Sequence, residues 1–342
     1  MPRFLGRAFV LATLLLVAGS ARAKDKEVTI AYQDMWNPWR VSIASGELEK
    51  ATGWKINWRL FTGGADVIRA LASGDVAIGE AGSSPIAAGL SQGIDVELFW
   101  ILEDIASAEA LVVRNGSGIT EPRDLRGKRI ATPFVSTSHY HLLFALEQFG
   151  IRPGEAQVVN LRPPEIAAAW ERGDIDAAFV WDPALSRIQK TGKVLLTSGL
   201  LSGWGKPTFD GIVVSRKFAR ENPEFVVAFV KAIASADERY RQSVASWTAG
   251  SAEVKAIAKV TGGKPEDIPA GVALYRFPTL QEQASPRWLG GGKDGGAARA
   301  LGFTAQFLKD QGRIQQFLPD YSTFVNPEWI RRAQGEAKSA AR

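Results

Sequence analysis

The sequence predicts an α/β protein built from two α/β lobes that are joined by a two-strand hinge. Strand-like and helix-like segments alternate at short intervals as far as Ser215, and such alternation favours mostly parallel sheets with helices on their faces. The alternation falls into two successive runs. Similar apolar segments, 110–113 and 211–214, flank the second run on both sides, as the two crossing strands of a hinge would.

The elements of the first run follow from periodicity and from turn residues. From Trp54 to Leu60 every second residue is bulky and apolar, which is typical of a strand. Gly63 and Gly64 open a helix, and Gly-Ser-Ser-Pro at 82–85 opens another, because proline suits the first helical turn. We therefore expect strands at 28–33, 54–60, 76–78 and 96–102, and helices from 39 to about 52, from 63 to the turn at 74–75, and from 82 onward.

The second run repeats this organisation, and a helical region follows it. We expect strands at 128–132, 158–161, 177–180 and 194–196, and helices at 136–150, 164–172 and 183–190. Beyond Ser215, Asn222 and Pro223 begin a long helix, whose buried stripe consists of Phe225, Phe229, Ile233, Ala236 and Tyr240. Further helices at 253–260 and 297–311 are expected to pack on the first lobe. The predicted division is 24–112 plus 213–342 for lobe 1 and 113–212 for lobe 2.

The first 23 residues have the features of a cleaved secretion signal. Arg3 and Arg7 precede an apolar run at 9–18, and Ala21-Arg22-Ala23 has the small-x-small pattern that signal peptidase recognises. The run is too short to span a bilayer, which takes roughly 20 residues. We therefore expect residues 1–23 to be a signal peptide and the remainder to be exported to the periplasm.

Composition excludes several classes of function. The chain has no cysteine, which excludes disulfides, thiolate nucleophiles and a lipid-anchored cysteine. Its net charge is +5, and loss of Arg3, Arg7 and Arg22 with the signal leaves about +2, too little to suggest nucleic acid. Only two histidines occur, and no phosphate-loop, Gly-x-Ser-x-Gly or His-Glu-x-x-His motif is present. We expect no catalytic residue, no metal and no cofactor.

Two short segments have the composition of an anion site. Gly82-Ser83-Ser84 and Ser136-Thr137-Ser138 each precede a predicted helix. A helix N-terminus offers free N–H groups and a partial positive charge, and hydroxyls add further donors. Serine and threonine are also ordinary helix caps. The argument for a ligand is that the two segments belong to different lobes and can face each other across a cleft.

Acidic and aromatic side chains lie near the ends of predicted strands, where ligands of α/β sheets gather. The acids are Asp34, Glu80, Glu103, Asp104, Glu109, Asp182 and Asp210. Glu109 and Asp210 directly precede the proposed hinge strands, and such a pair could bind an ammonium. Trp36 lies in a predicted loop, and Trp181 lies at the end of a predicted strand. Aromatic rings there suit a short alkyl chain or an ammonium.

The chain resembles the taurine-binding periplasmic proteins of ABC importers, within the wider group that binds sulfonates, nitrate and thiamine precursors. The resemblance extends over the chain after the signal. Its segments are 28–33 (VTIAYQ), 68–76 (IRALASGDV), 82–85 (GSSP), 107–113 (SAEALVV), 133–140 (PFVSTSHY), 169–176 (AWERGDID), 180–184 (VWDPA), 208–210 (TFD) and 306–309 (QFLK).

This resemblance implies a type II periplasmic-binding-protein fold whose lobes close on taurine or a related aliphatic sulfonate. It implies a monomer that delivers the ligand to an ABC permease and ATPase in the inner membrane. Glu109 and Asp210 match the amine site, and the Ser83 and Ser136–Thr137 regions match the sulfonate site. The ligand-binding residues we expect are Gln33, Trp36, Gly82, Ser83, Ser84, Glu109, Ser136, Thr137, Ser138, Tyr140, Trp181, Asp182 and Asp210.

Two features depart from the taurine-binding pattern, and two other functions stay open. The loop 34–39 is bulkier than the pattern expects, and Glu80 stands where a neutral residue is expected. Either feature could narrow the site or favour another sulfonate, nitrate or an amine. A sensory receptor would also need two closing lobes. An enzyme on the same fold is the remaining alternative, although the cofactor-attaching cysteine of the porphobilinogen-polymerising type is absent.

Overall fold

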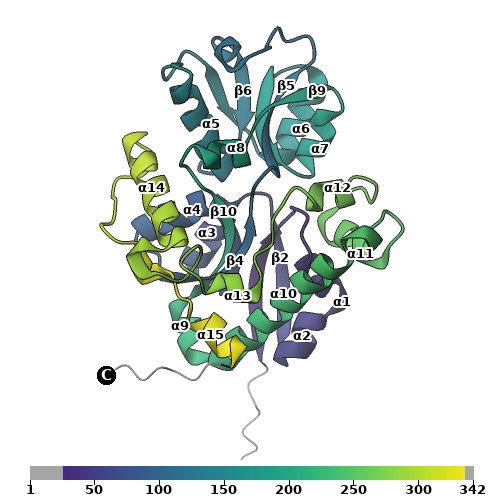
Figure 1. Ribbon diagram of the computed structural model, residues 1–342, viewed down its shortest axis with the longest axis vertical. Coiled ribbons are helices and arrows are strands. Elements are labelled where there is room, and N and C mark those ends of the chain that lie inside the picture. Colours follow the sequence, from purple (N-terminus) through teal and green to yellow (C-terminus); the bar gives the residue numbers. More distant parts are fainter. Residues whose placement is uncertain (1–25, 336–342) are drawn as a thin grey trace, which may run out of the picture.

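The computed structural model describes residues 26–335, and its strands form two separate five-stranded sheets (Figure 1). The predicted signal peptide, 1–23, lies outside the described residues. Lobe 1 has the strand order β2-β1-β3-β10-β4, and lobe 2 has the order β7-β6-β8-β5-β9. The strands of lobe 1 are β1 (Glu27–Gln33), β2 (Lys55–Phe61), β3 (Ile78–Gly82), β4 (Val96–Asp104) and β10 (Phe209–Ser215). Those of lobe 2 are β5 (Glu109–Arg114), β6 (Arg129–Thr132), β7 (Gln157–Asn160), β8 (Ala177–Trp181) and β9 (Gly192–Thr197).

The two sheets share one topology. In each sheet the first three strands in spatial order are parallel, and the fourth strand runs antiparallel to both of its neighbours. That fourth strand is β10 in lobe 1 and β5 in lobe 2. Every residue of β3 and of β8 is buried, as expected for strands that helices cover on both faces. The predicted mostly parallel α/β architecture is confirmed.

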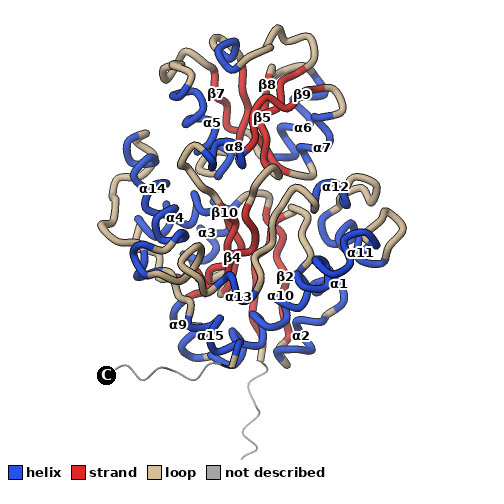
Figure 2. Tube along the Cα trace, viewed as in Figure 1, coloured by secondary structure: helices blue, strands red, loops and turns tan. Residues whose placement is uncertain are grey.

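Helices surround each sheet (Figure 2). The first lobe carries α1 (Trp39–Ser45), α2 (Glu47–Thr52), α3 (Gly64–Ser73) and α4 (Ser83–Ser91). The second lobe carries α5 (Thr137–Gln148), α6 (Pro163–Arg172), α7 (Ala184–Gln189) and α8 (Ser198–Gly203). The C-terminal region adds α9 (Arg216–Glu221), α10 (Pro223–Ser243), α11 (Ala252–Thr261), α12 (Ile268–Val272), α13 (Leu280–Gln283), α14 (Gly296–Asp310) and α15 (Glu328–Gln334). Among the described residues, no helix is both long and apolar enough to cross a membrane.

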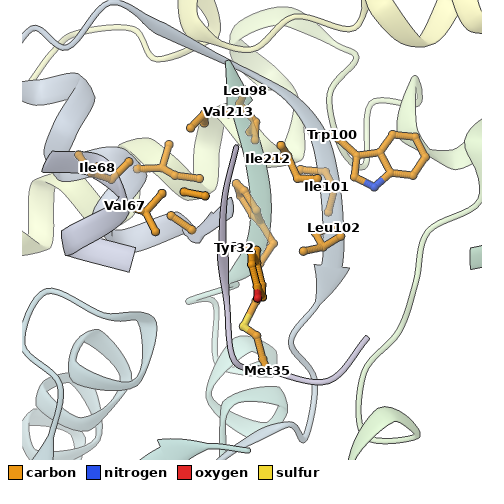
Figure 3. Close-up of a cluster of buried hydrophobic side chains, with 14 of the residues drawn as sticks. Tyr32, Met35, Val67, Ile68, Leu98, Trp100, Ile101, Leu102, Ile212 and Val213 are labelled. Carbon is orange, nitrogen blue, oxygen red and sulfur yellow. The ribbon is translucent and has the colours of Figure 1, made fainter. Parts of the chain in front are cut away.

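The core of lobe 1 joins distant parts of the chain. Val67 and Ile68 of α3 belong to the same buried cluster as Leu98 of β4 and Ile212 of β10 (Figure 3). The predicted stripe of α10, from Phe225 to Tyr240, is buried throughout. Helix α10 packs against α1 and α2, and α14 packs against α4. The C-terminal helices therefore cover lobe 1, as predicted, and α14 also contacts α5 of lobe 2.

Two expected elements of lobe 1 differ from the structure. The single helix expected from 39 to 52 is two helices, because Gly46 adopts the left-handed conformation (φ 66°) that ends α1. The strand expected at 76–78 is β3, which runs from Ile78 to Gly82. A β-carbon on Gly79 would lie 2.5 Å from Val67 Cγ1, so the glycine that resembles a turn residue instead allows α3 to pack closely on the sheet.

The chain crosses between the lobes just before the two predicted hinge strands. The first crossing is 105–108, between β4 and β5, and the second is 204–208, between α8 and β10. The segments 110–113 and 211–214 themselves pair along their length inside one sheet each. The predicted lobe boundaries after 112 and after 212 would cut β5 and β10. By sheet membership the divisions fall instead in the two crossing segments.

Candidate ligand-binding site

A small cavity lies where the two lobes meet. Lobe 2 contributes Glu109, Ser136, Thr137 and Trp181, and the remaining lining residues are Gln33, Met35, Gly64, Gly82, Pro85, Asp210 and Tyr275. The open space in and around the cavity is about 300 Å³. Most of it is too narrow for a water-sized sphere, whose centre is confined to about 10 Å³. That is room for about one water molecule. A larger solute therefore enters only when the lobes part.

Three helix N-termini converge on this cavity. Gly64 is the first residue of α3, Gly82 is the N-cap of α4, and Ser136 is the N-cap of α5. The first turn of each helix presents backbone N–H groups without intrahelical acceptors and a partial positive charge. No lysine or arginine of the described chain lines the cavity. The arrangement favours an anion that is held by neutral donors.

Glu109 is the acid that lobe 2 presents to the cavity. It begins β5 directly after the first crossing, opposite Trp181 of β8. The Thr137 hydroxyl donates to Glu109 Oε1, and the Ser198 hydroxyl oxygen lies within hydrogen-bond distance of Oε2, at 2.9 Å. Burial raises the pKa of Glu109 to about 7, although these two hydrogen bonds oppose the shift. A cation beside Glu109 would favour its ionised form.

Asp210 is the acid that lobe 1 presents. In the sheet it lies between Gly82 of β3 and Glu103 of β4. Burial raises the pKa of Asp210 well above its usual range, and the neighbouring Glu109 raises it further. Burial and the charge of Asp210 also raise the pKa of Glu103. Glu109 and Asp210 both line the cavity, and Glu103 is buried beside Asp210, so a ligand ammonium would relieve the mutual repulsion of these acids.

Glu80, which the sequence suggested could narrow the site or alter its specificity, does not line the cavity. Its carboxylate accepts two hydrogen bonds from Arg40, of which Nη1 to Oε2 measures 2.9 Å, and both side chains are fully buried. Arg40 also donates to the carbonyl oxygen of Gln33 at 2.8 Å. The pair therefore lies next to Gln33, which lines the cavity. Arg40 compensates the buried charge of Glu80.

The structure brings seven of the predicted ligand residues together at the cavity and places six away from its lining. Those at the cavity are Gln33, Gly82, Glu109, Ser136, Thr137, Trp181 and Asp210, and those away from it are Trp36, Ser83, Ser84, Ser138, Tyr140 and Asp182. Ser83 is buried behind the cavity and accepts a hydrogen bond from the backbone N–H of Phe209 at 3.4 Å. Ser84 and Ser138 are fully buried in the first turns of α4 and α5.

Packing between distant segments explains the other three displaced residues. The Trp36 ring lies under α12, where a β-carbon on Gly271 would be 2.7 Å from Trp36 Cζ3 and 2.6 Å from Asp182 Oδ2. Asp182 also accepts a hydrogen bond from the Ser186 backbone N–H at 2.8 Å. The Tyr140 ring packs edge-on against Phe307 of α14, with ring centroids 5.0 Å apart.

The two predicted hydroxyl groups that line the cavity, those of Ser136 and Thr137, are engaged within the protein. Thr137 donates its only hydroxyl proton to Glu109, and Ser136 donates to the Pro133 carbonyl oxygen at 2.6 Å. Ser136 also caps α5 by accepting from the His139 backbone N–H at 3.0 Å. The donors that the helix ends offer to an anion are therefore backbone N–H groups, such as those of Thr137 and Ser138 in the first turn of α5.

Four lining residues were not among the predicted ligand residues: Met35, Gly64, Pro85 and Tyr275. The glycine pair at 63–64 had indicated a helix start, which is the signal that could have identified Gly64. Tyr275 follows α12, far from the α/β units in sequence, and no local pattern marks it. Burial raises the pKa of its hydroxyl, and the surrounding acids, Glu103 and Asp210 foremost, raise it further.

Two α/β lobes that meet over this cavity define the class: the protein has the type II periplasmic-binding fold. The alkanesulfonate-binding protein SsuA of Xanthomonas axonopodis pv. citri, solved with bound MOPS, has the same fold. Its TM-score is 0.69 at 24% identity, and the match covers 85% of this chain and 95% of that one. The desulfurization enzyme DszB also has it, with a TM-score of 0.64 at 18% identity over 91% of this chain and 99% of that one. The fold alone therefore does not separate binding from catalysis.

Sequence similarity is more specific. The NMT1/THI5-like family profile matches residues 50–243. The taurine-binding periplasmic protein of Escherichia coli K12 is 41% identical over 325 residues, which is 95% of this chain and 98% of that protein. The chain belongs to the NMT1/THI5-like family, and it matches this binding protein over nearly the full length of both.

Proposed function

We propose that the protein binds taurine or a closely related aminoalkyl sulfonate and delivers it to an ABC importer. The observation that carries the proposal is the presence of both kinds of charge in the lining of one cavity. The lining includes the carboxyl groups of Glu109 and Asp210 and the N-termini of α3, α4 and α5. A permanently ionised sulfonate suits the helix ends, and an ammonium suits the acids. The likeness to the taurine-binding protein of E. coli supports this ligand.

The cavity is narrow. It has room for about one water molecule between its lining atoms, so even a small zwitterion enters only when the lobes part. The bulky loop 34–39 contributes Met35 to the lining, while Trp36 and Trp39 are buried in the protein. We therefore expect long-chain sulfonates to bind more weakly than taurine.

A thermal-shift panel tests the ligand. The protein is heated with taurine, longer aminoalkyl sulfonates, ethanesulfonate, nitrate and amino acids at equal concentration. A ligand that binds the folded state raises the Tm in proportion to the logarithm of its concentration over its Kd. Taurine should give the largest rise. A larger rise with nitrate or an amino acid, and none with any sulfonate, would contradict the proposal.

Export and partners are the cellular part of the proposal. Residues 1–23 serve as a cleaved signal peptide, and the exported chain acts in the periplasm as a monomer that meets an inner-membrane permease and ATPase. N-terminal sequencing of the exported protein should begin at Lys24, and light scattering should give the monomer mass. A strain without the gene should lose growth on taurine as sole sulfur source. Normal uptake in that strain would favour a sensory role.

The ligand is expected to leave the site unchanged. The full-length relative is named as a binding protein. Incubation of the protein with taurine should return all of the taurine. Release of sulfite would show that the site is catalytic.

A further inference from the structure

A chain of buried hydrogen bonds leads from the ligand cavity into lobe 2. Glu109 Oε2 is 2.9 Å from Ser198 Oγ, and Ser198 Oγ is 2.8 Å from Nδ1 of His141. The other ring nitrogen, Nε2, is 2.8 Å from the carbonyl oxygen of Lys206. Ser198 and His141 are fully buried. The chain begins directly after the first crossing between the lobes and ends in the second.

The supply of hydrogens in this chain determines its charge. A carbonyl oxygen only accepts, so Nε2 of His141 carries a proton. Ser198 has one hydroxyl hydrogen and two acceptor neighbours, Glu109 and Nδ1 of His141. If Glu109 were ionised and His141 neutral, one of these short contacts would join two lone pairs. The geometry is satisfied when the chain holds one further proton, either on Glu109 or on Nδ1.

We propose that Ser198 and His141 are positioning residues that accept the Glu109 proton when a ligand ammonium reaches the cavity. In this step Glu109 Oε2 gives its proton to Ser198 Oγ, and Ser198 gives its own hydroxyl proton to Nδ1 of His141. No proton leaves the protein. The two hydrogen bonds made by Ser198 reverse direction, and Nε2 of His141 continues to donate to the Lys206 carbonyl oxygen. The inference depends on the proposed binding of an aminoalkyl sulfonate.

The surroundings of both groups agree with this direction of transfer. Burial raises the pKa of Glu109 to about 7 and lowers that of His141 to about 4, so the proton lies on Glu109 without a ligand. Asp210 of lobe 1 is the charged neighbour of Glu109. The rings of Tyr140 and Phe179 lie near His141. The Lys206 ammonium points to the rings of Phe144 and Phe303, 5.6 and 5.8 Å from their centroids.

A ligand ammonium beside Glu109 reverses the balance. It favours the carboxylate, and the carboxylate in turn favours a positive charge on the imidazole that Ser198 links to it. The ligand ammonium, the Glu109 carboxylate and the His141 imidazolium then carry charges of alternating sign along the hydrogen-bond chain. This arrangement gives the amine a carboxylate to bind and leaves no unpaired lone pair behind it.

Nitrogen NMR of the histidines tests the transfer. The chain has two histidines, so protein labelled with ¹⁵N-histidine gives two imidazole spin systems, which a His139→Gln variant assigns. At pH 6, Nδ1 of His141 should have the shift of an unprotonated nitrogen without taurine and that of a protonated nitrogen at saturation. His139 is the internal control, because its Nδ1 accepts from the Val135 backbone N–H at 3.2 Å and should stay unprotonated.

Variants of Ser198 separate relay from mere packing. Ser198→Ala should abolish the taurine-induced protonation of His141 and weaken taurine about ten-fold, as for loss of a hydrogen bond to a charged group. Ser198→Thr keeps the hydroxyl and should restore both. Unprotonated Nδ1 in the taurine-saturated wild type would overturn the inference, even if Ser198→Ala binds weakly. If calorimetry on the same sample detects no taurine binding, the proposed function fails and the inference fails with it.

Discussion

Gly82 of lobe 1 and Thr137 of lobe 2 are in direct contact across the cavity. A β-carbon on Gly82 would lie 2.9 Å from Thr137 Cγ2 and 3.2 Å from Asp210 Oδ1. Gly82 has φ −63° and ψ 156°, a conformation that any residue adopts. The glycine is therefore required by the approach of the two lobes and not by its own backbone.

Gly82→Ala should impair closure without unfolding the protein. The added methyl group separates α5 from β3, so we expect at least about ten-fold weaker binding of taurine and of ethanesulfonate alike, from overpacking of about 1–3 kcal/mol. Calorimetric titration measures both. Gly203→Ala is the matched control, because an added β-carbon there meets no atom within 4 Å. Unchanged affinity in Gly82→Ala would show that the lobes do not close as the structure has them.

Asp210→Asn should distinguish the two ends of the ligand. Loss of the carboxylate charge should weaken taurine about ten-fold or more, since hydrogen bonds to charged groups contribute about 1.5–3 kcal/mol. Ethanesulfonate lacks the amine and should be affected little. The exposed Asp75→Asn serves as the charge-matched control. Equal losses for both ligands in Asp210→Asn would contradict the assignment of the acids to the amine.

Thr137→Ala should weaken mainly the binding of the ligand amine. From sequence, its hydroxyl was expected to bind the sulfonate, and the loss would then affect both ligands similarly. In the structure that hydroxyl donates to Glu109, so its removal should weaken taurine by about 1 kcal/mol or more and ethanesulfonate less. Titration of the variant with both ligands decides. Equal losses of affinity for the two ligands would indicate that the Thr137 hydroxyl binds the sulfonate.

The buried pair Arg40–Glu80 should contribute to stability far more than a surface pair. Arg40→Met leaves the Glu80 charge unpaired, which typically costs about 3–5 kcal/mol. Arg239→Met, which breaks an exposed pair with Glu47, should cost about 1 kcal/mol or less. Urea denaturation measures both losses in the free energy of unfolding. Similar values for the two variants would contradict a larger contribution of the buried pair.

Stability of the ligand-free protein should fall as pH rises from about 6.5 to 8. Burial raises the pKa of Glu109 to about 7 and those of Glu103, Asp210 and Asp237 well above normal. The folded state then holds more protons than the unfolded state, and the free energy of unfolding decreases with pH. The histidines, whose pKa is lowered, act in the opposite sense only below about 6.5.

The Tm measured across this pH range checks that sign. Glu109→Gln removes one of the titrating groups and should flatten the decline between pH 6.5 and 8. A Tm that is constant or rises over the same range in the wild type would contradict the raised pKa values of these acids.

Local sequence patterns were sufficient for most of the fold. Alternating strands such as 28–33 and the stripe from Phe225 to Tyr240 depend on periodicity that burial imposes. The strand Ile78–Gly82 was predicted too early, at 76–78, because Gly79 and Gly82 resemble turn residues. Because Gly79 and Gly82 have no side chain, Val67 of α3 and Thr137 of α5 pack closely against them. Those contacts exist only after folding.

The site was predictable where it depends on strand and helix ends, and not where it depends on distant contacts. Glu109 and Asp210 follow the chain crossings, so their positions could be inferred from topology. That Glu80 is paired with Arg40, and that Trp36 lies under α12, depends on how segments far apart in sequence pack. Tyr275 reaches the cavity from the C-terminal region, where no local sequence pattern indicates a cavity residue.

Calorimetric titration of the wild type with taurine and with ethanesulfonate shows whether the site recognises the ligand amine. The two ligands share the sulfonate and differ in the amine that Glu109 and Asp210 are proposed to bind. We expect taurine to bind at least ten-fold more tightly, because buried carboxyls left without their partner cost about 1–3 kcal/mol. Equal affinity for the two ligands, or no binding of taurine, would contradict the account.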